Sequence, residues 1–208
     1  MPAPLLFVPG TWAVDRYGRS ATADAFYARC VMLGLPIFDP DRPWWWSSAL
    51  DGVIGPHTNW EAGALSLVNY VGRRPVSLVA HSHGGQVALR AARDLQIDLL
   101  VTVATPVRAD IKPWIREARG NVREWTHFYS PRERGLPWQR LGSLFDGLFS
   151  PSQFFKWADR NVAVPDMGHS DLLACAPLWS LLENWYASLT DARWSKPDSP
   201  APAEPTSS

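Results

Sequence analysis

The chain has 208 residues, of which 46% are hydrophobic and 19% are charged, and its acidic and basic side chains balance to a formal net charge of zero. This length predicts one domain with a sizeable core, and the lack of net charge argues against binding to nucleic acid or to an anionic membrane by bulk charge. No apolar run is long enough to cross a membrane, and Leu5–Val8 is too short for a signal-peptide core. We therefore expect a cytoplasmic protein without stable membrane insertion.

The cysteines and histidines form no metal-binding pattern. No Cys/His cluster has the spacing of a zinc site. We expect neither a metal nor a cofactor. Cys30 and Cys175 lie in segments with helical patterns, and we interpret them as buried thiols. A disulfide between them stays open at this point, as does the oligomeric state.

Apolar patterning in the first part of the chain predicts alternating strands and helices. The predicted strands are 5–8 and 36–38, and the predicted helices are 20–33 and 60–71. Pro9–Gly10 ends the first strand in a tight loop that continues into Thr11 and Trp12, and Gly10 allows a close backbone approach there. Asn59 is the candidate cap of the second helix, and Trp44–Trp46 add aromatic surface to the connection before it.

The stretch around Ser82 predicts a buried strand, a sharp turn and a helix. Val76–Ala80 is an apolar run of strand length, Gly84 and Gly85 follow the turn, and apolar residues then recur at helical spacing. A serine at such a turn projects beyond the carboxyl end of the strand, beside helical N–H groups that have no internal partner. A nucleophile and its oxyanion hole need this arrangement, so we predict Ser82 as a catalytic nucleophile.

The rest of the chain continues the alternation. Further strands are predicted at 99–104, 122–129 and 161–164, with helices near 113–118 and from Ser170 or Asp171 to 189. Residues 136–158 are apolar without a clean period, which fits either a small cap over a pocket or a helix packed on the sheet. We expect a catalytic domain over residues 1–190 and a disordered tail over 191–208, where Pro, Ser, Ala and charged residues dominate.

Together these elements predict an α/β fold with a mostly parallel sheet of about six strands and helices on both faces, in a three-layer sandwich. Active sites of such sheets lie at the carboxyl ends of the strands. Thr11, Ser82, Glu133 and His169 each follow a predicted strand. We therefore expect these four residues to lie at one edge of the sheet.

The segment Ala80-His81-Ser82-His83-Gly84 resembles the G-x-S-x-G nucleophile elbow of the α/β-hydrolase superfamily, with Ala80 in place of the first glycine. Ser82, Glu133 and His169 also follow the superfamily's chain order of nucleophile, acid and base. The resemblance extends over roughly residues 3–189 and is closest to the compact serine esterases and lipases. It implies that these three residues form a catalytic triad.

His169 is the predicted base of this triad. An imidazole suits a base that takes the Ser82 proton and delivers it to the leaving group, because its unperturbed pKa lies near neutrality. The other histidines either flank the nucleophile or precede the loop of the acid, which is the wrong order for the superfamily. They are His57, His81, His83 and His127.

Glu133 is the predicted acid, which would orient His169 and stabilise its imidazolium form. It lies in the loop after the penultimate strand, the acid position of the superfamily, with Glu in place of the commoner Asp. Three aspartates remain alternatives: Asp110, Asp159 and Asp166. The resemblance implies an oxyanion hole made by the backbone N–H groups of His83 and Thr11, with Trp12 as the fallback donor.

A serine triad implies acyl transfer, most often to water, so we expect a hydrolase that cleaves carboxylic esters by an acyl-enzyme mechanism. The expected partner is a small-molecule ester, lipid-like or otherwise apolar in its acyl group, bound by Trp12, Trp46 and Trp138. Core packing is the competing explanation for about half of the tryptophans. A thioesterase or acyltransferase would use the same triad, and a non-catalytic module would use the same fold to bind a hydrophobic ligand.

Overall fold

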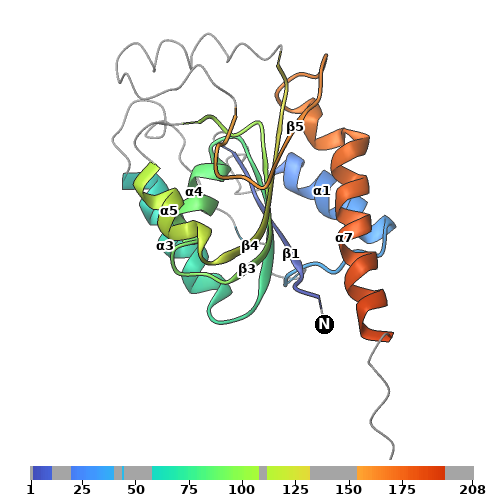
Figure 1. Ribbon diagram of the computed structural model, residues 1–208, viewed down its shortest axis with the longest axis horizontal. Coiled ribbons are helices and arrows are strands. Elements are labelled where there is room, and N and C mark those ends of the chain that lie inside the picture. The colour runs from blue at the N-terminus through green and yellow to red at the C-terminus, as the bar shows by residue number, and fades with distance from the viewer. Residues whose placement is uncertain are drawn as a thin grey trace, which may run out of the picture.

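A parallel sheet of five strands forms the middle layer of the computed structural model (Figure 1). The structure describes residues 2–10, 20–39, 44, 58–107, 112–131 and 154–194. Every pairing is parallel, and the strands lie side by side in chain order. They are β1 (Leu5–Val8), β2 (Val76–His81), β3 (Ile97–Val103), β4 (Val122–Tyr129) and β5 (Arg160–Ala163).

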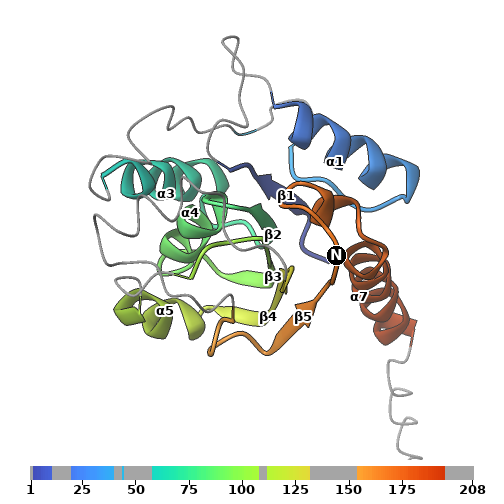
Figure 2. The ribbon, with the colours of Figure 1, turned by 90° about the horizontal axis from the view of Figure 1, so that it is seen from above.

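Helices cover both faces of the sheet, as Figure 2 shows from above. One face carries α1 (Ala21–Met32) and α7 (Ala176–Trp194), which the 3-10 helix η1 (Asp171–Ala174) precedes. The other face carries α3 (Thr58–Val71), α4 (Gly84–Ala91) and α5 (Lys112–Arg119). The predicted three-layer α/β architecture is confirmed.

Alternation along each strand divides the core between the two faces. In β1, Leu5 and Phe7 belong to the core cluster on the side of α1 and α7, whereas Leu6 and Val8 belong to the cluster on the side of α3, α4 and α5. All four side chains are completely buried. A strand covered on both faces needs apolar residues at successive positions, which explains the near-continuous apolar runs in the sequence.

The chain reverses the direction in which it builds the sheet between β1 and β2. After α1, Ile37 joins Leu5 through a single parallel bridge on the edge of β1 that faces away from β2. The chain then returns through α3 to the other edge of β1, where β2 and the later strands follow in order. Ligands of open parallel sheets bind beyond the strand ends at such a reversal. Gly10 and Ser82 follow β1 and β2 at this place.

Several predicted boundaries differ from the structure. The strand predicted at 36–38 contributes only the bridge at Ile37, so the described residues form five strands of the sheet. The helix α3 begins at Thr58, so Asn59 lies inside its first turn and does not precede it. The helix α7 continues to Trp194, past the domain boundary predicted at residue 190.

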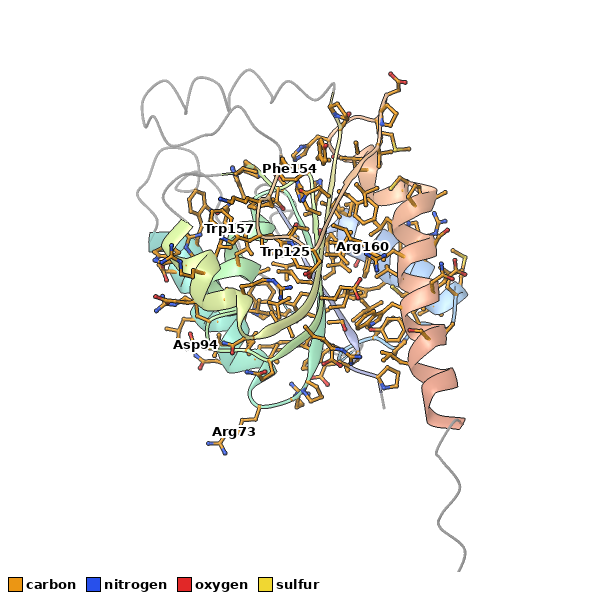
Figure 3. All side chains as sticks on the ribbon, viewed as in Figure 1. Arg73, Asp94, Trp125, Phe154, Trp157 and Arg160 are labelled. Atoms are coloured by element: carbon orange, nitrogen blue, oxygen red, sulfur yellow. The ribbon has the colours of Figure 1, made fainter. Side chains whose placement is uncertain are left out.

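The predicted cap segment, 136–158, lies mostly outside the described residues, but its last part belongs to the core. Phe155 is completely buried, and its ring centroid lies 5.1 Å from that of Trp125. The Asn161 side chain accepts a hydrogen bond from the Phe155 N–H and donates one to the Phe155 carbonyl, each over 2.9 Å. In Figure 3, Trp125 points from β4 toward α4 and α5. Arg73, which precedes β2, projects beyond the end of the sheet at which the strands begin.

The two cysteines are buried free thiols, as predicted. Neither Cys30 nor Cys175 forms a disulfide, although both belong to the core cluster on the side of α1 and α7. Burial raises the pKa of Cys30 to about 12, so this thiol stays protonated and unreactive at neutral pH.

Within the described ranges, no helix combines the length and the apolar character that crossing a membrane requires. The cytoplasmic location stays a prediction.

Candidate functional site

Ser82 lies at the tip of the turn between β2 and α4, as predicted. Its φ of 53° is in the left-handed region, which costs a non-glycine residue about 1–3 kcal/mol. Backbone hydrogen bonds on both sides hold this conformation. The Ser82 N–H donates to the Val103 carbonyl at the end of β3 over 2.8 Å, and the Gly85 N–H donates to the Ser82 carbonyl over 3.0 Å. A strained serine between a strand and a helix is the geometry of a nucleophile elbow.

Two glycines let the backbone segments around Ser82 meet more closely than side chains would allow. A Cβ on Gly84 would lie 2.3 Å from the carbonyl oxygen of Val8 and 2.5 Å from that of Pro9. The first turn of α4 therefore rests directly on the end of β1. A Cβ on Gly10 would lie 2.8 Å from the Cβ of Ser82, so the loop after β1 begins against Ser82.

A third glycine makes the corresponding contact with the end of β3. A Cβ on Gly85 would lie 2.1 Å from the Oγ1 of Thr105. Thr105 follows Ala104, whose φ of 49° is also left-handed. The first turn of α4, with the backbone N–H groups that follow Ser82, is thus fixed between two strand ends.

His169 lies in the loop after β5, and the structure brings it beside the elbow. The Nε2 of His81 and the carbonyl oxygen of His169 are 3.1 Å apart. The centroids of the two imidazole rings are 4.8 Å apart. His81 is the last residue of β2 and directly precedes Ser82. Two of the three predicted triad residues therefore lie at the same edge of the sheet.

His81 is a neutral hydrogen-bond donor in this arrangement. Burial, and to a smaller extent the neighbouring His169 ring, lowers the pKa of His81 to about 3. A neutral imidazole carries one N–H, and a carbonyl oxygen only accepts. The hydrogen of His81 must therefore lie on Nε2 and point at the His169 carbonyl.

His83, the residue after Ser82, precedes α4 and is buried. Its ring centroid lies 5.5 Å from that of Trp60 in α3, and the guanidinium of Arg90 lies 5.2 Å from the Trp60 ring. This packing holds the backbone at the start of α4. The first N–H groups of a helix have no partner within the helix, which suits them to stabilise an oxyanion.

The described acid candidates differ in their surroundings. Asp159 uses both carboxylate oxygens: Oδ2 accepts from the Trp125 N–H over 2.8 Å, and Oδ1 pairs with Arg119. It precedes β5, at the opposite end of that strand from His169. These contacts give Asp159 a structural role. Asp166 lies in an exposed turn with a φ of 65°.

Several predicted site residues lie outside the described residues. They are Thr11, Trp12, Trp46, Asp110, Glu133 and Trp138. Trp44, in the aromatic connection, is described and is not at the predicted surface. It is buried, and its indole N–H donates to the Oγ of Ser66 in α3 over 3.1 Å. Trp44 is therefore a core residue.

Sequence patterns did not identify the contact between His81 and His169. Every position of β2 is buried, and a polar side chain at the end of a buried strand needs a hydrogen-bond partner. That requirement was the available signal. The partner is 88 positions further along the chain, so only the folded structure identifies it.

Comparisons with known proteins agree with this fold. A family model described as "Alpha/beta hydrolase family" matches residues 5–204. The chain is similar to the structure of a predicted CIB-like hydrolase from Thermoplasma acidophilum, with 12% identity, a TM-score of 0.51 and coverage of 91% of this chain and 87% of that chain. It is also similar to Est1E from Butyrivibrio proteoclasticus, with 10% identity, a TM-score of 0.50 and coverage of 91% and 89%. At these identities the likeness demonstrates the fold alone. No curated protein matches the chain in sequence.

Proposed function

The chain belongs to the alpha/beta hydrolase family, and from this premise we propose that it is a serine hydrolase that cleaves carboxylic esters through an acyl-enzyme. The geometry around the turn at Ser82 carries the proposal. Ser82 is held in a strained left-handed conformation at the tip of the elbow. His81, the residue before Ser82, is hydrogen-bonded to the main chain of His169. Strain of this kind at a strand–helix turn is typical of a functional residue.

In the proposed reaction, the Ser82 Oγ attacks the ester carbonyl carbon while His169 accepts the hydroxyl proton. The carbonyl oxygen becomes an oxyanion, which the backbone N–H groups of His83 and Thr11 stabilise by about 3–4 kcal/mol each. As the carbon–oxygen bond breaks, His169 gives its proton to the departing alkoxide, which leaves as an alcohol. Water then attacks the acyl-Ser82 with His169 as the base, which releases the carboxylic acid and regenerates the serine.

Glu133 completes the proposed triad by orienting His169 and stabilising the imidazolium that forms during each step. Its place in the chain, after β4, supports this role, because acids of this superfamily follow the corresponding strand. Asp110 and Asp166 are the alternatives. Asp159 is disfavoured, because its two oxygens are engaged with Arg119 and the backbone of β4.

The proposed substrate is a small ester with an apolar acyl group, lipid-like or otherwise. The residues that directly follow β1 to β4 carry no charge: Pro9, Ser82, Ala104 and Ser130. Uncharged residues at these four described positions favour an uncharged acyl group beside Ser82. Trp12, Trp46 and Trp138 are the proposed contacts of the acyl chain.

Hydrolysis of p-nitrophenyl esters from acetate to octanoate tests this proposal. We expect turnover with the longer esters, and we expect Ser82→Ala to lower kcat by about 10⁴-fold or more. Ser77→Ala is the matched control, because it removes a buried serine from the amino-terminal part of β2, the strand before Ser82. Unchanged hydrolysis in Ser82→Ala would contradict the role of the serine.

The same series separates the alternatives. Activity that peaks at acetate and vanishes by octanoate would contradict the proposal of an apolar acyl group but would still agree with a serine hydrolase. Faster turnover of the matching thioesters would identify a thioesterase. Binding of a hydrophobic fluorophore without turnover of any ester would identify a non-catalytic module.

A further inference from the structure

We propose that His81 is a positioning residue: the hydrogen bond from its Nε2–H to the His169 carbonyl holds the loop of the base against the strand of the nucleophile. This inference rests on the proposed function, since a base needs such positioning only if Ser82 is the nucleophile. It adds a residue to the site that the triad and the oxyanion hole do not include.

The need for an anchor follows from the order of the strands. β5 is separated from β2 by β3 and β4, so the two strands are about 14 Å apart at the usual spacing of neighbouring strands. The loop after β5 must therefore cross the ends of two strands to bring His169 beside the elbow. β5 itself has no fully buried position, and Val164 and Met167 of the loop are only partly buried against the core.

Two further backbone contacts of the loop tie it to nearer elements. The Val164 N–H donates to the Tyr129 carbonyl of β4 over 2.8 Å, and the Gly168 N–H donates to Asp171 Oδ2 over 3.2 Å. Of these three contacts, the bond from His81 is the one that joins the loop to β2. Because it is made to the main chain of His169, it fixes the loop without using a ring nitrogen of the base.

The chemistry of His81 suits this role. During the proposed reaction His169 becomes a cation, and a second cation 4.8 Å away would oppose that step. Burial keeps His81 uncharged at neutral pH, so it donates a hydrogen bond without adding charge. A lysine or arginine could also donate to the carbonyl, but its charge would disfavour the imidazolium.

Two substitutions separate positioning from packing. His81→Leu fills much of the same volume without a donor, whereas His81→Gln places an amide N–H near the position of Nε2. The matched control is His127→Leu, which removes a completely buried histidine of β4 that is hydrogen-bonded to Thr102. For each variant we would measure kcat and KM with an ester, the rate of phosphonylation by a fluorophosphonate, and Tm.

We expect His81→Leu to lower kcat and the phosphonylation rate by about 10- to 100-fold with KM within about 2-fold, because displacing a catalytic group by about 1 Å has an effect of that size. His81→Gln should recover most of the loss, and His127→Leu should lower Tm with kcat within about 3-fold of the wild type. Wild-type kcat in His81→Leu, or a His81→Gln as impaired as His81→Leu at equal Tm, would overturn the inference.

A second measurement does not depend on activity. Long-range ¹H–¹⁵N NMR correlations of the wild-type protein should show His81 as the neutral Nε2–H tautomer at pH 7. The Nδ1–H tautomer would exclude the hydrogen bond and overturn the inference, even if both variants fail to fold. A wild-type protein that neither hydrolyses esters nor reacts with the fluorophosphonate would refute the proposed function itself. An active wild-type enzyme whose kcat does not change in His81→Leu would refute only the role of His81.

Discussion

Replacing Gly84 by alanine should separate the first turn of α4 from the end of β1. The added Cβ would lie 2.3 Å from the Val8 carbonyl oxygen, 2.5 Å from the Pro9 carbonyl oxygen and 2.9 Å from the Pro9 carbonyl carbon. All three atoms belong to the backbone, so no side chain can rotate away to make room. The helix or the end of the strand must move instead.

The size of the effect follows from these distances. Ordinary contact begins at 3.4 Å, so the new methyl group overlaps the Val8 oxygen by about 1.1 Å (3.4 − 2.3) and the Pro9 oxygen by about 0.9 Å (3.4 − 2.5). Overpacking of this kind typically costs about 1–3 kcal/mol. We expect a cost near the upper limit here, because the atoms that the new methyl group meets belong to the backbone. The better helix propensity of alanine returns at most about 1 kcal/mol. We expect a net loss of about 2 kcal/mol in the free energy of unfolding.

Urea and thermal unfolding measure this loss. For a chain of this length, about 2 kcal/mol corresponds to a decrease in Tm of about 4–8 °C. Gly120→Ala is the matched control, because its Cβ would meet nothing closer than the Glu117 carbonyl at 3.7 Å. That variant should match or slightly exceed the stability of the wild type, since alanine restricts the unfolded chain. A Gly84→Ala protein as stable as Gly120→Ala would refute the close contact between α4 and β1.

Three further predictions concern Gly85, His81 and the acid candidates. Gly85→Ala should also destabilise the protein, because its Cβ would lie 2.1 Å from the Oγ1 of Thr105. Adding Thr105→Ala removes that atom and should restore part of the stability. Urea midpoints of the single and double variants check this. The folded-state pKa of His81 is lowered to about 3, so the contribution of neutral His81 to the free energy of unfolding is complete above pH 6.5. As the pH falls toward 3, this contribution declines by up to about 1.4 kcal/mol per pH unit. Urea midpoints measured at a series of pH values should show this slope in the wild type and a flatter one in His81→Gln. Glu133→Gln should lower kcat by about 100-fold or more, whereas Asp159→Asn should lower Tm with kcat nearly unchanged, and the reverse result would exchange their roles.

Local patterns predicted most of the fold and the elbow. The strand, turn and helix around Ser82 were predictable because the apolar run, the glycines and the helical spacing all lie within about twenty residues, where chain sterics dominate. The order of strands and helices then followed from similar runs. The glycines were predictable as turn residues, but the backbone oxygens of Val8 and Pro9 against Gly84 became visible only in the structure.

Tertiary packing decided the features that the patterns missed. Trp44 lies in a connection that we interpreted as aromatic surface. Its indole N–H donates a hydrogen bond to Ser66 of α3, and its ring packs in the core. The helix predicted from Ser170 or Asp171 to 189 is divided into the single turn η1 and the helix α7, because Cys175 adopts an extended backbone between them. Pro177 favours this interruption, because a proline lacks the N–H that would continue the helix from Leu173 and is tolerated only in the first turn.

Long-range hydrogen bonds were the least predictable part of the candidate site. The bond between His81 and His169 joins positions 88 residues apart, and no local pattern encodes it. The same is true of Asp159, whose partners Trp125 and Arg119 come from other elements and give it a structural role. The identity of the acid stays a prediction that rests on the chain order of Ser82, Glu133 and His169.

Reaction of the folded protein with a fluorophosphonate, followed by peptide mapping, tests the central claim most directly. An activated serine reacts with such a probe, whereas an ordinary surface hydroxyl does not. We predict one modified residue, Ser82, with labelling lost on unfolding and in His169→Ala. Absence of labelling in the folded protein, or labelling at another serine, would contradict Ser82 as the nucleophile.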